Sequence, residues 1–133
     1  MSNRWIFVLF LGLAALLFAP PASHAAPTTV DSIVVVPNPY NVSGRTFAKT
    51  GEAGYERLRF ANLPTPCTIW IYTSAGNLVD KLVQGNPNCR WQSSQMLWNG
   101  RNSDNQYIVS DVYIYIVEHE TFGRKIGKFI VIR

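Results

Sequence analysis

The chain has 133 residues, of which 47% are apolar and 15% are charged, and its formal net charge is +4. A chain of this length suits a single domain, which excludes a multidomain enzyme. The charge is too small for a strongly basic nucleic-acid binder, so we expect no nucleic acid among its partners.

The first 25 residues have the pattern of a secretory signal peptide. Arg4 gives a short positive start, residues 5–19 form an apolar run without charge, and small residues at 23–25 offer a cleavage site. The apolar run is too short for a good membrane span, which excludes a helical membrane protein. Cleavage after Ala25 leaves 133 less 25, or 108, residues with a charge of +3, because Arg4 is removed. We therefore expect an exported domain over 26–133, located in the periplasm, on the cell surface or outside the cell.

Seven short runs rich in Val, Ile, Tyr, Phe and Trp follow, separated by turn residues, and such runs are typical of β-strands. The predicted strands are 32–36, 57–61, 67–72, 78–83, 91–98, 112–118 and 125–132. The last two are joined by a tight turn at 120–123 and predict a hairpin. No window after the signal peptide shows helical periodicity with caps. This spacing predicts an all-β protein, an antiparallel β-sandwich of immunoglobulin-like type with about seven strands.

Six segments, taken in order, resemble a known family. They are VPNPY at 36–40, FANLP at 60–64, IWIYTSAGNLV at 69–79, WNGRN at 98–102, VYIY at 112–115 and KIGKF at 125–129. Together they are similar to the FlgD-like immunoglobulin-like domain and to the C-terminal sorting domains of proteins exported by the type IX secretion system. The resemblance implies an interaction module for sorting, surface attachment or assembly, with an envelope or secretion-machinery protein, or another copy of itself, as partner.

Sorting domains of that family normally follow an enzyme or an adhesin. Here the predicted signal peptide runs almost directly into the first strand, which favours a stand-alone module over an address label.

Groups that could carry catalysis are few. His119, beside Glu118 and Glu120, is the only histidine after the signal peptide, and no nucleophile elbow, paired-carboxylate motif or P-loop is present. We expect no enzyme, no cofactor and no metal site. The loop 99–111 does hold oxygen donors suited to calcium, but Asn and Asp are also ordinary turn residues, and a plain polar loop is favoured. The donors are Asn102, Asp104, Asn105 and Asp111.

Cys67 and Cys89 form an even pair in an exported chain, where a disulfide is permitted. A bridge between them is expected to contribute about 3 kcal/mol to stability on the chain-entropy model. The alternative is a buried free thiol at Cys67.

Aromatic side chains suggest a binding face. If Cys67, Ile69 and Ile71 point inward, the two-residue period of a strand turns Trp70 and Tyr72 outward. If Val112, Ile114 and Ile116 also point inward, Tyr113 and Tyr115 join the outward set. The stripe of Trp70, Tyr72, Tyr113 and Tyr115 would stack on sugar rings or anchor a protein. The alternatives are cross-strand packing or an inverted register.

Positive charge gathers on the C-terminal strand, at Arg124, Lys125, Lys128 and Arg133. Basic residues on an edge strand deter pairing with other sheets. By the family resemblance they would also serve recognition by a secretion or attachment machine. A partner strand has two candidate edges for pairing, at 33–36 and 129–133.

These features predict a secreted, non-enzymatic β-sandwich that works by protein–protein contact in sorting, attachment or extracellular assembly. The alternative function is a carbohydrate-binding module that holds a polysaccharide on its aromatic stripe. The two alternatives differ in their partner, and neither involves chemistry.

Overall fold

The structure is a computed structural model that describes residues 25–41 and 58–133. Residues 1–24 of the predicted signal peptide and residue 57 of the second predicted strand lie outside the described residues. Within the described ranges no helix is long and apolar enough to cross a membrane. The described chain forms nine strands in two sheets, so the predicted β-sandwich is confirmed. The strands are β1 (Val34–Val36), β2 (Tyr40–Asn41), β3 (Leu58–Ala61), β4 (Thr68–Thr73), β5 (Leu78–Leu82), β6 (Cys89–Gln92), β7 (Gln95–Trp98), β8 (Asp111–His119) and β9 (Gly123–Ile132).

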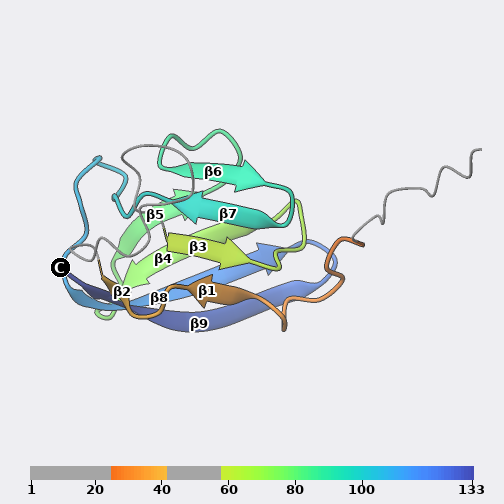
Figure 1. The fold of residues 1–133 in the computed structure, drawn as a ribbon, viewed down its shortest axis with the longest axis horizontal. Helices are drawn as coiled ribbons and strands as arrows, with labels where there is room; N and C mark the ends of the chain where they lie inside the picture. The colour runs from red at the N-terminus through yellow and green to blue at the C-terminus, as the bar shows by residue number, and fades with distance from the viewer. Residues whose placement is uncertain (1–24, 42–57) are drawn as a thin grey trace, which may run out of the picture.

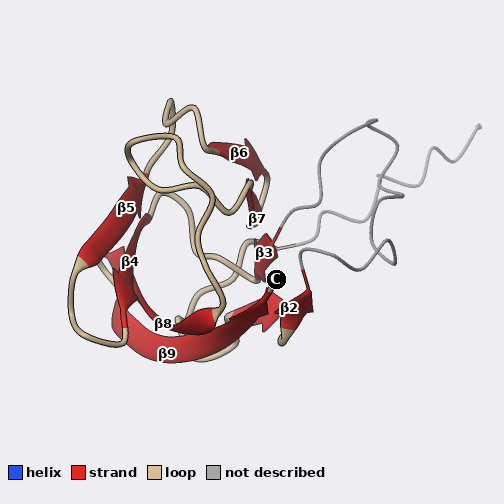
Figure 2. Ribbon diagram, turned by 90° about the vertical axis from the view of Figure 1, so that its left-hand side faces the viewer, coloured by secondary structure: helices blue, strands red, loops and turns tan. Residues whose placement is uncertain are grey.

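One sheet has four strands in the order β1-β3-β7-β6, and the other has five in the order β2-β9-β8-β4-β5. Figure 1 shows the strands of the two layers, and Figure 2 shows the five-stranded sheet curving around the space between them. Neighbouring strands are antiparallel except β2, which runs parallel to β9. The hairpin of β8 and β9 is the longest pairing among the described strands and was predicted from the sequence.

Two features differ from the sequence prediction. The run 91–98 is not one strand but part of a hairpin of β6 and β7, which turns at Ser93 and Ser94. Ser93 adopts a positive φ of 51°, a conformation that a residue other than glycine seldom takes, so the turn left no clear mark in the sequence. The short strand β2 was also not predicted. It arises where the chain leaves β1 and crosses to the other sheet at Pro37 and Pro39, which have no N–H to extend β1.

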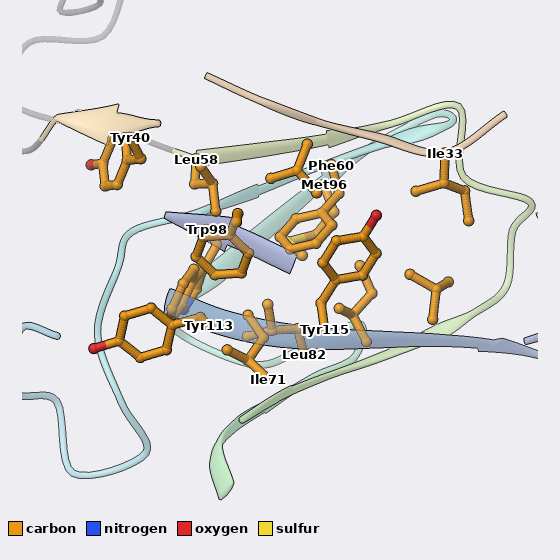
Figure 3. Packing of buried hydrophobic residues seen from close by; sticks show 14 of the residues in the cluster. Ile33, Tyr40, Leu58, Phe60, Ile71, Leu82, Met96, Trp98, Tyr113 and Tyr115 are labelled. Carbon is orange, nitrogen blue, oxygen red and sulfur yellow. The ribbon is translucent and has the colours of Figure 1, made fainter. Parts of the chain in front are cut away.

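Phe129, on β9, lies at the centre of the core between the sheets and is fully buried. Its ring stacks on those of Tyr113 and Tyr115, with centroid distances of 5.6 and 6.4 Å. It meets Phe60 and Trp98 of the opposite sheet edge-on, at 6.2 and 6.1 Å. Figure 3 labels the four partner residues among the buried side chains of the core. Such aromatic pairs contribute about 0.5–1.5 kcal/mol each beyond the area they bury, so this cluster joins the two sheets.

The inward face of β8 is the opposite of the one expected. Tyr113 and Tyr115 are only 2% and 5% exposed, whereas Val112 is 37% exposed and Ile114 and Ile116 are half-buried. The sequence prediction of inward-facing aliphatic residues on this strand is therefore wrong. The tyrosine rings fill the wide space between the sheets that the branched aliphatic side chains would leave empty.

Two local contacts accommodate the buried tyrosines. The Tyr113 hydroxyl donates a hydrogen bond to the Val109 carbonyl at 2.9 Å, so its buried polar atom is satisfied. The Tyr115 ring lies over Gly127, its cross-strand neighbour on β9, in the position that a Cβ on that glycine would occupy. Burial raises the pKa of both phenols above the ordinary value of 10.0.

Asp80 on β5 is a buried carboxylate held by polar partners. It accepts hydrogen bonds from the Lys81 backbone at 2.8 Å and from the side-chain amides of Asn86 at 3.2 Å and Asn88 at 2.9 Å. The Asn88 amide also donates to the Asn102 carbonyl at 2.9 Å. This network joins β5 to the loops on either side of the β6–β7 hairpin, and the sequence analysis did not identify it.

Replacing Gly127 by alanine is expected to destabilise the domain by about 1–3 kcal/mol, because the added methyl group overlaps the Tyr115 ring. Urea unfolding followed by tryptophan fluorescence measures this loss. The double variant Tyr115→Leu with Gly127→Ala gives the control. The two changes should be less than additive, because the smaller side chain removes the overlap. Full additivity would show that the ring and the glycine do not constrain one another.

Candidate interaction surface

The five-stranded sheet turns one face away from the four-stranded sheet, and this face is rich in apolar side chains. Because side chains alternate along strands, the residues on it are the neighbours of the core residues. Four aliphatic side chains of β8 and β9 are well exposed there: Ile126 at 60%, Ile132 at 47%, Ile130 at 41% and Val112 at 37%. The half-buried side chains beside them are Ile114, Ile116, Trp70 and Tyr72. We call these eight residues the outer patch.

The strand register makes the outer patch continuous. Ile126 on β9 is paired with Ile116 on β8, and Ile116 is paired with Trp70 on β4. The next row joins Lys128, Ile114 and Tyr72 in the same way. In the first row three adjacent strands present apolar side chains side by side, and in the second row Ile114 and Tyr72 continue the apolar surface beside Lys128. Grouped apolar exposure of this kind is typical of an interaction surface.

Trp70 is fixed on this face by two charged neighbours. Its indole N–H donates to a Glu118 carboxylate oxygen at 3.1 Å, and the Lys81 ammonium lies 4.5 Å from the ring centroid. A cation over an aromatic ring is attracted by the ring quadrupole. One face of the indole is therefore in contact with Lys81, and only the remaining part of the ring is available to a partner.

The predicted aromatic stripe is only half present. Trp70 and Tyr72 lie on the outer patch, as expected, but Tyr113 and Tyr115 are in the core. The predicted exposure of these two tyrosines is wrong, because β8 presents its tyrosines to the core and its isoleucines to the outside. The surface that results is mostly aliphatic, and the sequence analysis did not find Ile126 or Ile130 as part of it.

The four basic residues of the C-terminal strand divide into two pairs. Arg124 and Lys128 are exposed on the outer face, on either side of Ile126. Lys125 points the other way, and its ammonium donates to the carbonyls of Asp31 at 2.7 Å and Ile33 at 2.9 Å. Arg133 lies over the Tyr107 ring and donates to the Ile108 carbonyl at 3.3 Å. Two of the four cations therefore stabilise the fold, and two are presented to solvent.

In the polar loop 99–111, the side-chain oxygens that had been considered as calcium ligands accept hydrogen bonds from the loop itself and from adjacent segments. Oδ1 of Asn102 accepts hydrogen bonds from the backbone N–H groups of Asp104 and Gln106, at 3.1 and 2.8 Å. Asp111 accepts from its neighbour Val112 and from the Ser74 hydroxyl. Asn105 has a positive φ of 62°, as turn residues do. Among the described residues no group of three or more His, Cys, Asp or Glu side chains is placed to hold a metal ion.

His119 holds the turn of the β8–β9 hairpin. Its Nδ1 accepts hydrogen bonds from the backbone N–H groups of Thr121 at 3.0 Å and Phe122 at 3.2 Å, and its ring stacks on Phe122 at a centroid distance of 4.5 Å. Two open hollows meet beside it, and Glu118 and Glu120 line both. The larger hollow, about 440 Å³, borders His119, and the smaller, about 380 Å³, borders Cys67 and Trp91.

Both cysteines are free thiols in the structure, which does not contain the predicted disulfide. Cys67 lies immediately before β4 in the five-stranded sheet, and Cys89 begins β6 in the other sheet. The Cys89 thiol is turned towards the Val83 carbonyl, at 3.4 Å. Both side chains are half-buried and pack against the core. Burial raises the pKa of Cys67 from 9.0 to about 12 and that of Cys89 to about 11.

These raised pKa values predict slow alkylation of the native thiols. At pH 9 the native Cys89 holds on the order of a hundredfold less thiolate than the unfolded chain, and Cys67 holds less still. Iodoacetamide labelling followed by mass spectrometry, with and without urea, measures the difference. Since the folded pKa values are raised, the thiols contribute stability that is fully present below pH 9. That contribution is lost as pH rises towards 11–12, so the urea midpoint should fall over this range.

The labelling experiment also tests the disulfide. A peptide pair joined through Cys67 and Cys89 in the unreduced protein would show that the bridge forms in solution. Rapid labelling of the native protein would contradict the protection expected from burial.

Comparisons with known proteins identify a similar fold and no family. No protein-family model matches the chain, and no curated protein matches it. Among solved structures it is similar to PorZ of Porphyromonas gingivalis, described as an essential bacterial surface component of the type-IX secretion system. The TM-score is 0.59, with 22% sequence identity over 83% of this chain. The match spans 13% of the PorZ chain, so the likeness concerns one domain-sized part of that protein.

Proposed function

We propose that the chain is an exported, non-enzymatic β-sandwich that binds a protein partner in secretion, surface attachment or extracellular assembly. The observation that carries the proposal is the outer patch, where three adjacent strands present apolar side chains on one face of the sheet, and those of β8 and β9 include four exposed aliphatic ones. Apolar surface of this kind gains free energy when a partner removes it from water, about 25 cal/mol per Å². Burying a surface needs no reactive group, so binding alone accounts for the site.

The similarity of the fold to that of PorZ also supports a role in secretion. PorZ is described as a surface component of a secretion system, and the family resemblance of the sequence segments also points to type IX secretion. A small domain that occurs within a larger surface protein is suited to holding or recognising other components. The proposal therefore includes binding to a component of the type IX secretion machinery. It also includes export by the predicted signal peptide at 1–25 and an immunoglobulin-like type of sandwich.

A protein partner fits the outer patch better than a polysaccharide. Sugar rings stack on exposed aromatic faces, and two of the four aromatic residues expected on the surface are buried in the core. The indole of Trp70 already has Lys81 against its ring. Aliphatic side chains such as Ile126 and Ile130 offer no stacking face, but they fill the pockets of protein interfaces well.

The test is a surface substitution, since truncating β9 would remove Phe129 and Val131 from the core. Ile126→Asp places a charge at the most exposed aliphatic side chain of the outer patch. The matched control is Val34→Asp, which changes an aliphatic residue of 47% exposure on the four-stranded sheet. Both variants should keep the melting temperature of the parent domain within a few degrees, because neither side chain is buried.

The tagged chain and both variants are expressed in a host that possesses type IX secretion and in the same host without it. We expect surface retention of the parent and of Val34→Asp only where the machinery is present. Retention of Ile126→Asp should fall by about fivefold or more, since loss of an interface residue that contributes strongly to binding costs over ~1 kcal/mol. Equal retention in both hosts would contradict the secretion role. Equal retention of all three proteins would contradict the outer patch as the binding surface.

A further inference from the structure

Among the strands that the structure describes, none pairs with β9 along most of one of its sides. On its other side it is paired with β8 along nine consecutive residues, from Gly123 to Val131. On this side β2 is paired only with Val131 and Ile132. Within the described residues no strand adjoins 123–130 on this side. In Figure 2 the strand curves along the rim of the sandwich, with the short β2 at one end.

The backbone groups that face this side follow from two hydrogen bonds. The Ile130 N–H donates to Oδ1 of Asn38 at 3.0 Å, and Nδ2 of Asn38 donates to the Lys128 carbonyl at 3.4 Å. Even-numbered residues of β9 therefore turn their N–H and C=O groups away from β8, as alternation in an antiparallel ladder requires. The same alternation places the N–H and C=O groups of Arg124 and Ile126, and the N–H of Lys128, along the side without a partner. We call this row of groups the free edge.

Asn38 limits the free edge at one end. Its side-chain amide makes the two hydrogen bonds that a residue of a neighbouring strand would make, and β2 begins just beyond it. The sequence analysis had proposed pairing at 129–133, and that part of the strand is already occupied by Asn38 and β2. The segment that remains for a new partner is 124–128.

The side chains beside the free edge have a distinct charge pattern. Arg124 and Lys128 are exposed on the outer face, and Ile126 lies between them. Lys128 is paired across the strands with the apolar Ile114, whereas Arg124 is paired with Glu118, whose carboxylate accepts a hydrogen bond from the Trp70 indole. Within residues 25–41 and 58–133 neither cation makes an ion pair. A second copy of β9 paired antiparallel about Ile126 would set Arg124 against Lys128 of the other copy, and like charges directly opposite are destabilising. The pattern thus disfavours self-pairing and favours an acidic partner.

From this arrangement we infer that β9 binds its partner by strand addition, with an extended partner segment pairing along 124–128. The segment carries acidic side chains on both sides of an apolar one, which meet Arg124, Lys128 and Ile126. Backbone hydrogen bonds supply affinity in this mode, and the alternate side chains supply specificity. The inference rests on the proposed protein-interaction role and names the chemistry of the partner.

The first test uses backbone amide exchange. In the free protein the amides of Arg124, Ile126 and Lys128 should exchange faster than those of Lys125 and Gly127, which are turned towards β8. The probe is a short synthetic peptide in which two glutamates flank a central valine at alternate positions. Its addition should protect the three fast amides. A peptide with lysines in place of the glutamates, and one with methylated backbone nitrogens, are the controls and should give no protection.

The second test uses variants of the domain. Ile126→Pro removes an N–H of the free edge without breaking the β8 ladder, since proline is tolerated where the N–H faces solvent. It should abolish peptide binding. Lys128→Glu should weaken binding by about threefold to fivefold, as expected for a partly exposed charge pair. Arg59→Glu, the same charge change on the exposed face of the four-stranded sheet, is the matched control and should leave binding unchanged. Thermal unfolding confirms that each variant is folded.

The outcomes separate this inference from the proposed function. Absence of binding by the acidic peptide, or equal binding by folded Ile126→Pro or by the methylated peptide, overturns strand addition. Surface retention that depends on Ile126 in cells would then leave the outer patch as the interaction site. Peptide binding with the expected pattern, but without machinery-dependent retention, would support the free edge and contradict the role in secretion.

Discussion

The contact between the Tyr115 ring and the backbone of Gly127 determines how the five-stranded sheet is oriented. Glycine is required at this position because any side chain would overlap the ring. With Tyr115 turned inward, strand alternation also sends Tyr113 and Val117 into the core and Ile114 and Ile116 to the outside. The pairing with β9 then brings Phe129 between the sheets and leaves Ile126 in solvent. Both the aromatic core and the outer patch therefore follow from the packing of the Tyr115 ring on Gly127.

Much of the strand pattern could be predicted from the sequence, but the orientation of β8 could not. Six of the seven predicted runs match single strands within a few residues, because turn residues and β-branched residues mark them clearly. In β8 every position from Val112 to Val117 is apolar, so the two-residue period of a strand does not show which of the two alternating sets of side chains is buried. The deciding information lies on another strand, in the glycine that sits opposite Tyr115. A glycine opposite an aromatic residue in a predicted hairpin is the signal that could have identified the inward face.

The binding surface was predicted in part, for the same reason. The sequence identified Arg124 and Lys128 as basic residues of the last strand but grouped them with Lys125 and Arg133, which make contacts within the fold. Alternation along β9 separates the first pair from Lys125, and only the register shows that Ile126 lies between them on the outer face. The occupied end of β9 depends on hydrogen bonds with the Asn38 side chain, which is distant in sequence and whose contact with β9 no local pattern predicts. The sequence therefore showed which side chains could bind a partner, but not which face of the sheet each of them lies on.

The parallel pairing of β2 with β9 has a mechanical consequence. Tension applied between residues 25 and 133 pulls β2 towards its N-terminal end and β9 towards its C-terminal end. In a parallel pair these pulls slide one strand along the other, so the hydrogen bonds across Tyr40–Asn41 are stretched together instead of being peeled apart in turn. The crossing at Pro37 and Pro39 thus adds, close to residue 133, a short strand pair that such tension would load in shear.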